Sequence, residues 1–191
     1  GGTLYTDTGG TGNLRLGEDA GDAVTGNFNV LVGKDSGTAL EGGAGNVGLG
    51  YRTLYTSVAG DYNTAIGREA LLTSNVSGNN YNTAVGAFAG KLVTTSTEST
   101  FLGANAGAVG LSSGSKNTFV GSQAGLGVST KLTGDGNTAI GRYAGAALQG
   151  TAAGNTLIGM NCGDDITTGD SNIVIGYNLD VPTAGGDSQL N

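Results

Sequence analysis

The chain has 191 residues, 39 of them glycine, with no histidine or tryptophan, one cysteine, and a net charge of −7. The acidic balance and the absence of any basic run argue against nucleic-acid and anionic-membrane surfaces. A single cysteine excludes an intramolecular disulfide, and no apolar run reaches the roughly 20 residues of a membrane span.

In chain order we expect one β-solenoid domain over residues 1–191. Residues 1–12 are interpreted as an N-terminal lead-in or cap, residues 13–180 as ten coils, and residues 181–191 as a C-terminal tail. The ten coils share the pattern Asn-x-x-aliphatic-Gly, repeated every 16–20 residues. A short, regular period of this kind is typical of a solenoid. The closing glycines are Gly17, Gly33, Gly50, Gly67, Gly86, Gly103, Gly121, Gly141, Gly159 and Gly176.

The three residues that directly precede each closing glycine predict a short β-strand. The residue directly before the glycine is aliphatic in all ten copies, and the residue two earlier is β-branched in nine. Alternating branched residues favour a strand with a buried face. The middle residue is polar only at Arg15, so both faces are apolar, and we expect one to fill the coil and the other to pack against sister chains.

The position two before the glycine is threonine in six of the ten copies. Regular threonine arrays on flat solenoids can bind ice. Because these threonines share a face with the wholly aliphatic column, we expect them to point inward, which argues against ice binding. On the same assignment we expect Ile140→Asp to collapse the fold and Lys131→Asp, in a long segment between coils, to be tolerated.

The remaining columns predict the corners. An asparagine opens nine of the ten copies, and stacked asparagines can form an amide ladder. The closing glycine suits a corner that needs positive φ. Three residues later comes a small residue in most copies, Cys162 among them, which we expect to point inward. Variable segments at 72–81, 91–98 and 126–136 are expected to form an exposed rim.

The repeats "NTAIGREAL", "NTAVGAFAG" and "NTAIGRYAG" resemble the head repeats of YadA-type trimeric autotransporter adhesins. They are more similar still to the repeat regions of phage tail-fibre proteins that end in an intramolecular chaperone domain. The stretch 171–191 resembles the segment that leads toward that chaperone. The resemblance implies a left-handed parallel β-roll, a homotrimer, and an extracellular role in attachment or as a fibre. The coils here are longer than those of the adhesin heads.

The chemistry-bearing residues do not assemble into a recognisable site. "GAGNVG" at 43–48 matches a dinucleotide motif but lacks the helix that such a site requires. Cys162 has no histidine partner, and the acids at 18–19, 164–165, Asp135, Asp170 and Asp187 form no column. We therefore predict no enzyme, no cofactor, no metal site and no catalytic residue, with an incidental loop Ca²⁺ left open.

Aromatic residues outside the strands offer two interpretations. They can pack between chains or stack against sugars. They are Tyr51, Tyr62, Tyr81, Phe88, Tyr143 and Tyr177.

The sequence thus predicts an attachment or structural module, a stiff segment of a phage tail fibre or a bacterial surface adhesin. Its expected partners are sister chains in a trimer and a cell-surface receptor or glycan. One alternative is the subunit of an extracellular filament, built by end-to-end stacking of rolls. A glycan-degrading tailspike is a further alternative, which would need carboxylates on neighbouring coils.

Overall fold

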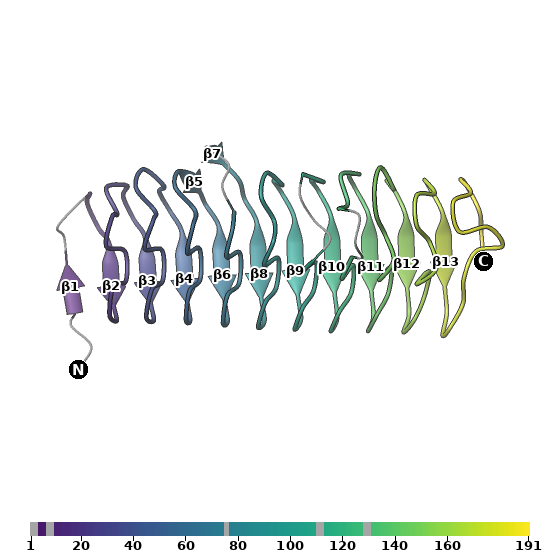
Figure 1. Ribbon diagram of the computed structural model, residues 1–191, viewed down its shortest axis with the longest axis horizontal. Coiled ribbons are helices and arrows are strands. Elements are labelled where there is room, and N and C mark those ends of the chain that lie inside the picture. Colours follow the sequence, from purple (N-terminus) through teal and green to yellow (C-terminus); the bar gives the residue numbers. More distant parts are fainter. Residues whose placement is uncertain (1–3, 7–9, 75–76, 110–112, 128–130) are drawn as a thin grey trace.

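The computed structural model describes residues 4–6, 10–74, 77–109, 113–127 and 131–191. The described chain is all-β, without a helix, and forms a parallel β-solenoid of about nine turns (Figure 1). Its main sheet has eleven strands: β1 (Leu4–Thr6), β2 (Leu14–Leu16), β3 (Val30–Val32), β4 (Val47–Leu49), β6 (Thr64–Ile66), β8 (Thr83–Val85), β9 (Thr100–Leu102), β10 (Thr118–Val120), β11 (Thr138–Ile140), β12 (Thr156–Ile158) and β13 (Ile173–Ile175). The predicted all-β, parallel β-solenoid fold is confirmed.

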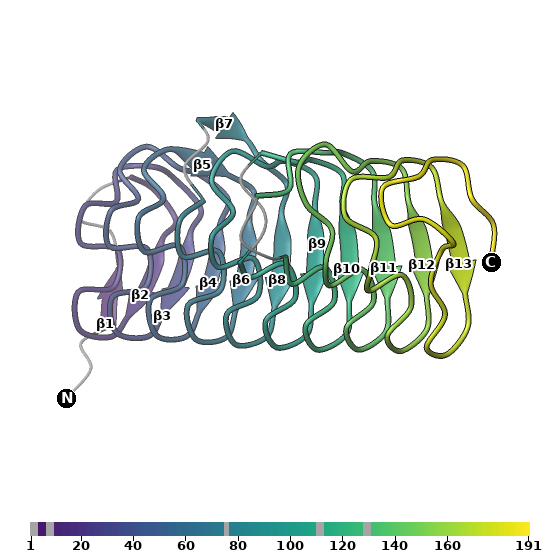
Figure 2. The ribbon, with the colours of Figure 1, turned by 45° about the vertical axis from the view of Figure 1, so that its right-hand side comes forward.

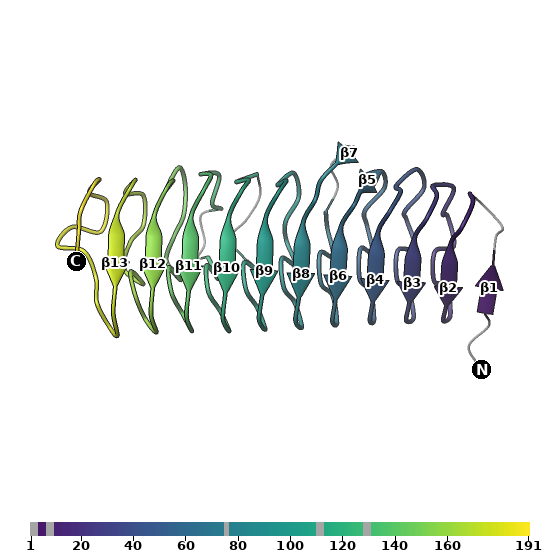
Figure 3. The same ribbon diagram turned by 180° about the vertical axis from the view of Figure 1, so that it is seen from behind.

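The ten strands from β2 to β13 lie side by side and parallel in one row (Figure 1). Each pairs with the next at equivalent repeat positions, so that Thr118 faces Thr138 and Phe119 faces Ala139. We call each strand and the chain that follows it a rung. Figures 2 and 3 show the rungs stacked along a single axis, with both chain ends at opposite ends of the stack.

The structure reverses the predicted inward and outward faces of the strands. In each of these ten strands the middle residue is buried, and the two flanking residues are half-buried or exposed. Ala139 is fully buried, whereas Ile140 in the all-aliphatic column is 39% exposed. The aliphatic and threonine columns therefore point outward, and the expectation that they point inward is wrong.

The physical reason lies in the narrow interior, where residue sizes must compensate one another. A Cβ added at Gly125 would lie 2.3 Å from the Phe119 ring, so the glycine makes room for the aromatic side chain. In the two rungs where the middle strand residue is Gly48 or Ala65, the equivalent position holds Leu54 or Leu71, both fully buried. An interior packed in this way requires side chains of varied size in the inner column. A column of similar side chains, such as the aliphatic one, can face outward.

The small column after the glycine points inward, as the sequence predicts. Ala70, Ala89, Ala124, Ala144 and Cys162 are fully buried. The exception is the last rung, where the equivalent residue, Leu179, is 37% exposed.

The predicted asparagine ladder is present and buried. The backbone N–H of Asn155 donates to Oδ1 of Asn137 at 3.1 Å, and its side-chain Nδ2 donates to the same oxygen at 2.9 Å. Nδ2 of Asn155 also donates to the carbonyl of Gly169 at 2.9 Å. The pattern changes at Ser99, whose Oγ accepts from the Asn117 backbone N–H at 3.1 Å without supplying an amide.

The closing glycine of each rung adopts positive φ, as predicted. Gly86 has φ 135°, and a Cβ there would lie 2.6 Å from the carbonyl of Gly103 in the next rung. The neighbouring backbone therefore excludes a side chain, in addition to the preference set by φ.

A second ladder, which sequence reasoning missed, runs two residues before the asparagines. The backbone N–H of Ser115 donates to Asp135 at 2.7 Å, that of Ala153 to Asp170 at 2.8 Å, and that of Asp170 to Asp187 at 2.8 Å. These aspartates satisfy backbone donors of the preceding rung. The available signal was their constant spacing from the asparagine column.

The two ends of the stack differ. At the N-terminal end β1 pairs antiparallel with β2, and within the lead-in residues 1–3 and 7–9 lie outside the described residues. At the other end the 181–191 tail returns to the sheet, where the Ile173 N–H donates to Gln189 and the Asn191 N–H donates to Ile173. A separate pair, β5 (Gly60–Asp61) with β7 (Gly78–Asn79), stands at the upper edge in Figure 1.

Candidate functional surfaces

The outward side of the sheet is a long uncharged surface, which we call the outer face. Its first column follows the asparagines and its second precedes the glycines. The first column is Leu14, Val30, Val47, Thr64, Thr83, Thr100, Thr118, Thr138, Thr156 and Ile173; the second is Leu16, Val32, Leu49, Ile66, Val85, Leu102, Val120, Ile140, Ile158 and Ile175. Several are substantially exposed, including Leu102 at 46% and Ile175 at 57%. An uncharged surface of this length with a continuous aliphatic column is typical of an interaction surface.

Six threonines form an unbroken row within the outer face. Thr64, Thr83, Thr100, Thr118, Thr138 and Thr156 are paired in register from strand to strand. Their hydroxyls have no hydrogen-bond partner among the residues that the structure describes. They are therefore spaced by the strand repeat of about 4.8 Å and open to solvent in the single chain.

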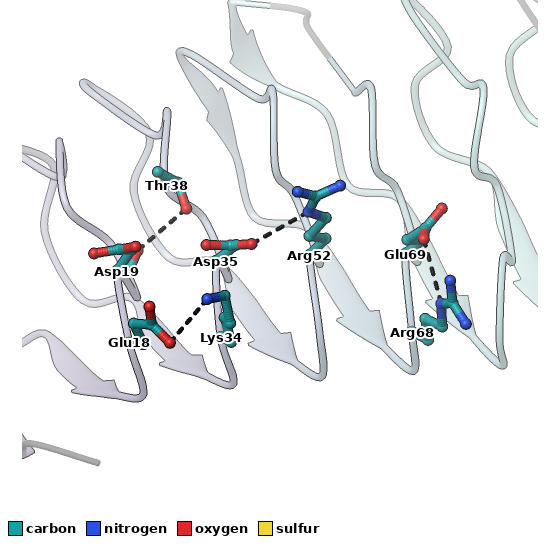
Figure 4. Close-up of polar contacts among 8 residues, drawn as sticks. All are labelled: Glu18, Asp19, Lys34, Asp35, Thr38, Arg52, Arg68 and Glu69. Carbon is teal, nitrogen blue, oxygen red and sulfur yellow. Dashed lines mark hydrogen bonds and ion pairs between the residues drawn. The ribbon is translucent and has the colours of Figure 1, made fainter. Parts of the chain in front are cut away.

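Charged side chains gather at the corner that follows the strands, in the first rungs (Figure 4). Lys34 Nζ lies 2.8 Å from Glu18, and Arg52 Nε lies 3.2 Å from Asp35. Glu69 receives Lys91 Nζ at 2.8 Å and Arg68 Nε at 3.3 Å. The contact with Lys91, and then with Arg68, holds the pKa of Glu69 below its ordinary value despite burial.

Aromatic rings alternate with the cations of this corner. The Arg52 guanidinium carbon lies 4.8 Å from the Tyr55 ring centre and 5.1 Å from that of Tyr51. The Arg68 guanidinium lies 5.9 Å from Tyr51 and 5.2 Å from Phe88, and Lys91 Nζ lies 4.9 Å from Phe88. We call this continuous series the cation–aromatic ridge: Tyr55, Arg52, Tyr51, Arg68, Phe88 and Lys91.

The other aromatic residues singled out in the sequence lie elsewhere. Tyr62 and Tyr81 stack on each other with ring centres 5.2 Å apart, and about half of each is exposed. Tyr143 lies under Arg142 at 4.5 Å, and Tyr177 is 69% exposed near the end of the stack. Tyr51, Tyr143 and Tyr177, which follow the closing glycines by one or two residues, thus lie on distant rungs.

The remaining candidate residues have structural partners. Cys162 is buried, its Sγ donates to the Val174 carbonyl at 3.0 Å, and burial raises the pKa of the thiol. In the 43–48 motif, Asn46 belongs to the buried ladder and Gly48 faces the coil interior. No three His, Cys, Asp or Glu side chains of the described chain are grouped so as to hold a metal ion.

Acids dominate the C-terminal rungs, where no lysine or arginine follows Arg142. Desolvation by burial, and then the charge of Asp180, raise the pKa of Asp164. The backbone N–H of Asp165 donates to Asp180 at 3.1 Å. The paired acids at 164–165 thus both lie close to Asp180.

Comparison with family models, curated proteins and solved structures finds no match to this chain. Within the described residues, no helix has the length and apolar character to cross a membrane.

Proposed function

We propose that the chain is a structural and attachment module, a stiff segment of an extracellular fibre in which three copies associate through the outer face. The observation that carries the proposal is the outer face itself, two uncharged columns along ten parallel strands. Water-exposed aliphatic side chains in such a continuous array favour burial against another surface.

A second copy of the same chain is the partner that fits this surface best. Copies related by a rotation axis parallel to the solenoid place equivalent rungs at the same height, so aliphatic columns meet aliphatic columns along the whole rod. The number three follows from the resemblance of the repeats to trimeric adhesin heads and tail-fibre regions. The proposed role is mechanical, and the proposal assigns the chain no catalytic step.

The test is the subunit number in solution. We expect native mass spectrometry and light scattering to give three chains per particle. Ile140→Asp, on the outer face, is expected to yield a monomer that keeps its β-sheet circular dichroism, while Lys131→Asp is the matched charge control and stays trimeric. A wild-type protein that is monomeric at all concentrations, or an Ile140→Asp variant that remains trimeric, would contradict the proposal.

Growth into longer particles would instead favour the filament alternative. Light scattering distinguishes the two outcomes, because a closed trimer has a fixed mass whereas end-to-end stacking increases the mass with concentration.

One observation favours a second candidate function, binding to ice. The threonine row points outward in strict register, which removes the reason for rejecting ice binding on the sequence alone. The test is thermal hysteresis and inhibition of ice recrystallisation, with Thr118→Lys as the disrupting variant. Activity in the wild type that Thr118→Lys abolishes would support ice binding; no activity at any concentration would eliminate it.

A further inference from the structure

The cation–aromatic ridge is a surface feature that the proposed association through the outer face does not explain. It lies at the corner after β4, β6 and β8, and spans three neighbouring rungs, or about 10 Å along the axis. Each cation contacts at least one ring, and Tyr51 and Phe88 each take two cations. Elsewhere Arg142 contacts Tyr143 alone.

Carboxylates beneath the ridge fix the direction of its cations. The side chains of Asp35 and Glu69 are both 11% exposed, whereas those of Arg52, Arg68 and Lys91 are 40%, 61% and 33% exposed. Asp35 and Glu69 bind the Nε atoms of the two arginines. The terminal amino groups of both guanidinium groups have no hydrogen bond to another described residue, and so can receive a ligand.

The backbone beneath the ridge is also fixed. The N–H of Arg52 donates to the Lys34 carbonyl at 3.0 Å, that of Glu69 to Tyr51 at 2.8 Å, and that of Phe88 to Arg68 at 2.8 Å. These bonds join successive rungs. The ridge is therefore arranged before any ligand arrives, which lowers the entropic cost of binding.

Charge makes the ridge distinct from the rest of the rod. Its three cations and the two carboxylates below it sum to one positive charge, whereas the rest of the chain holds eight net negative charges. Because the carboxylates are the buried partners, the exposed side of the ridge presents guanidinium, ammonium and ring surfaces. Guanidinium groups bind carboxylates in a bidentate manner, and aromatic rings pack against the C–H faces of sugars.

We propose that the cation–aromatic ridge binds an acidic polysaccharide, with uronate carboxylates on Arg52 and Arg68 and sugar rings against Tyr51 and Phe88. The inference rests on the proposed attachment function and specifies its ligand class. The sugar ring lies where the rings of the ridge are exposed, and the carboxylate reaches the free amino groups on either side of Tyr51.

The experiment uses the full chain in its native assembly and oligogalacturonate as the probe, with binding followed by isothermal titration calorimetry. The methyl-esterified oligosaccharide keeps the rings and removes the charge, and polyphosphate keeps the charge and removes the rings. We expect oligogalacturonate to bind, and both control probes to bind at least tenfold more weakly. Equal binding of polyphosphate would reduce the ridge to a non-specific anion site and overturn the proposal.

The matched variants are Arg68→Gln at the ridge and Arg142→Gln at the isolated pair, which occupy the same position in their rungs. Loss of a charge-assisted contact is expected to weaken oligogalacturonate binding about ten- to hundredfold in Arg68→Gln. Arg142→Gln is expected to bind as the wild type does. An equal loss in both variants, or no binding by the wild type, would overturn the proposal.

Light scattering on the same samples separates this proposal from the proposed function. A trimer that does not bind oligogalacturonate contradicts the ridge proposal alone. A monomer that binds it through Arg68 supports the ridge and contradicts the trimeric assembly.

Discussion

The inner and outer faces of the same ten strands are both apolar, but they obey different packing rules. The inner column ranges in size from Gly48 to Phe119, because each side chain must fit the residues opposite it in a narrow coil. The outer columns hold similar branched residues in every rung. Uniformity thus marks a surface that repeats along an axis, and variation marks an interior that must be filled.

The largest expected effect contrasts two neighbouring residues of β10. Phe119→Asp places an unpaired charge in the fully buried interior, which costs several kcal/mol, and we expect the β-sheet circular dichroism to be lost. Val120→Asp, on the outer face, is expected to keep that signal and to disrupt assembly only. Collapse of Val120→Asp with survival of Phe119→Asp would reverse the assignment of the faces.

Asn137→Ala tests the contribution of the asparagine ladder to stability. The change removes the acceptor for the Asn155 backbone N–H and the 2.8 Å bond from Nδ2 to the Ala152 carbonyl. With each buried unsatisfied group costing about 1–3 kcal/mol, we expect a loss of about 2–4 kcal/mol in chemical denaturation. Asp135→Ala loses one exposed bond and serves as the control, with an expected cost of about 1 kcal/mol. Equal costs would show that the ladder is not the stronger element.

Two acidic groups, Glu69 in the early rungs and Asp164 in the C-terminal rungs, are expected to give opposite pH responses. Glu69 has a lowered pKa when folded, so its stabilisation is present above its unfolded pKa and is lost as pH falls through the folded value. Asp164 has a raised pKa, so its stabilisation is present below the unfolded value and is lost as pH rises through the folded one. Hydrogen exchange should therefore show the early rungs loosening as pH falls below the ordinary pKa of a glutamate, and the C-terminal rungs loosening as pH rises above the ordinary pKa of an aspartate.

Two variants isolate these effects. Glu69→Gln should remove the acid sensitivity of the early rungs, and Asp180→Asn should reduce the sensitivity of the C-terminal rungs to rising pH. If neither variant changes the pH response, other ionisable groups are responsible for it.

The smallest expected effect is a gain. Ser99→Asn would supply the amide that the ladder lacks, donating to Asn82 Oδ1, which already accepts the Ser99 N–H at 3.0 Å. We expect a rise in the free energy of unfolding of about 0.5–1 kcal/mol, measured by chemical denaturation. A loss would indicate that the 2.9 Å contact between the Ser96 and Ser99 hydroxyls already compensates for the missing amide.

The period, the strands, the glycine corners and the asparagine ladder were predictable because each depends on a residue type that recurs at a fixed place. The choice of inner face was not predictable in the same way, because both strand faces are uncharged apart from Arg15. Arg15 made the assignment harder, because a charged residue is not expected in an inner column. It lies in the first parallel strand, where its side chain is buried and donates to the Gly21 carbonyl at 2.6 Å. Size compensation between Gly48 and Leu54 was a usable signal.

The cation–aromatic ridge was less predictable from the sequence. Tyr51 and Phe88 were noted as possible sugar-stacking residues, but their cations come from positions that carry no periodic signal. Arg52 and Phe88 also have positive φ values of 53° and 62°, which sequence propensities do not favour for such side chains. Only the stacking of rungs brings the six residues into one series.

The antiparallel direction of β1 has a consequence for growth. A strand arriving at this end would meet the free edge of β1, which runs against the direction of every rung. The parallel strand pairing that accompanies the asparagine ladder ends at β2. The ladder therefore cannot extend into another molecule at this end while β1 stays in place. A second rod therefore cannot continue the parallel row of strands at this end of the described structure unless β1 is displaced first.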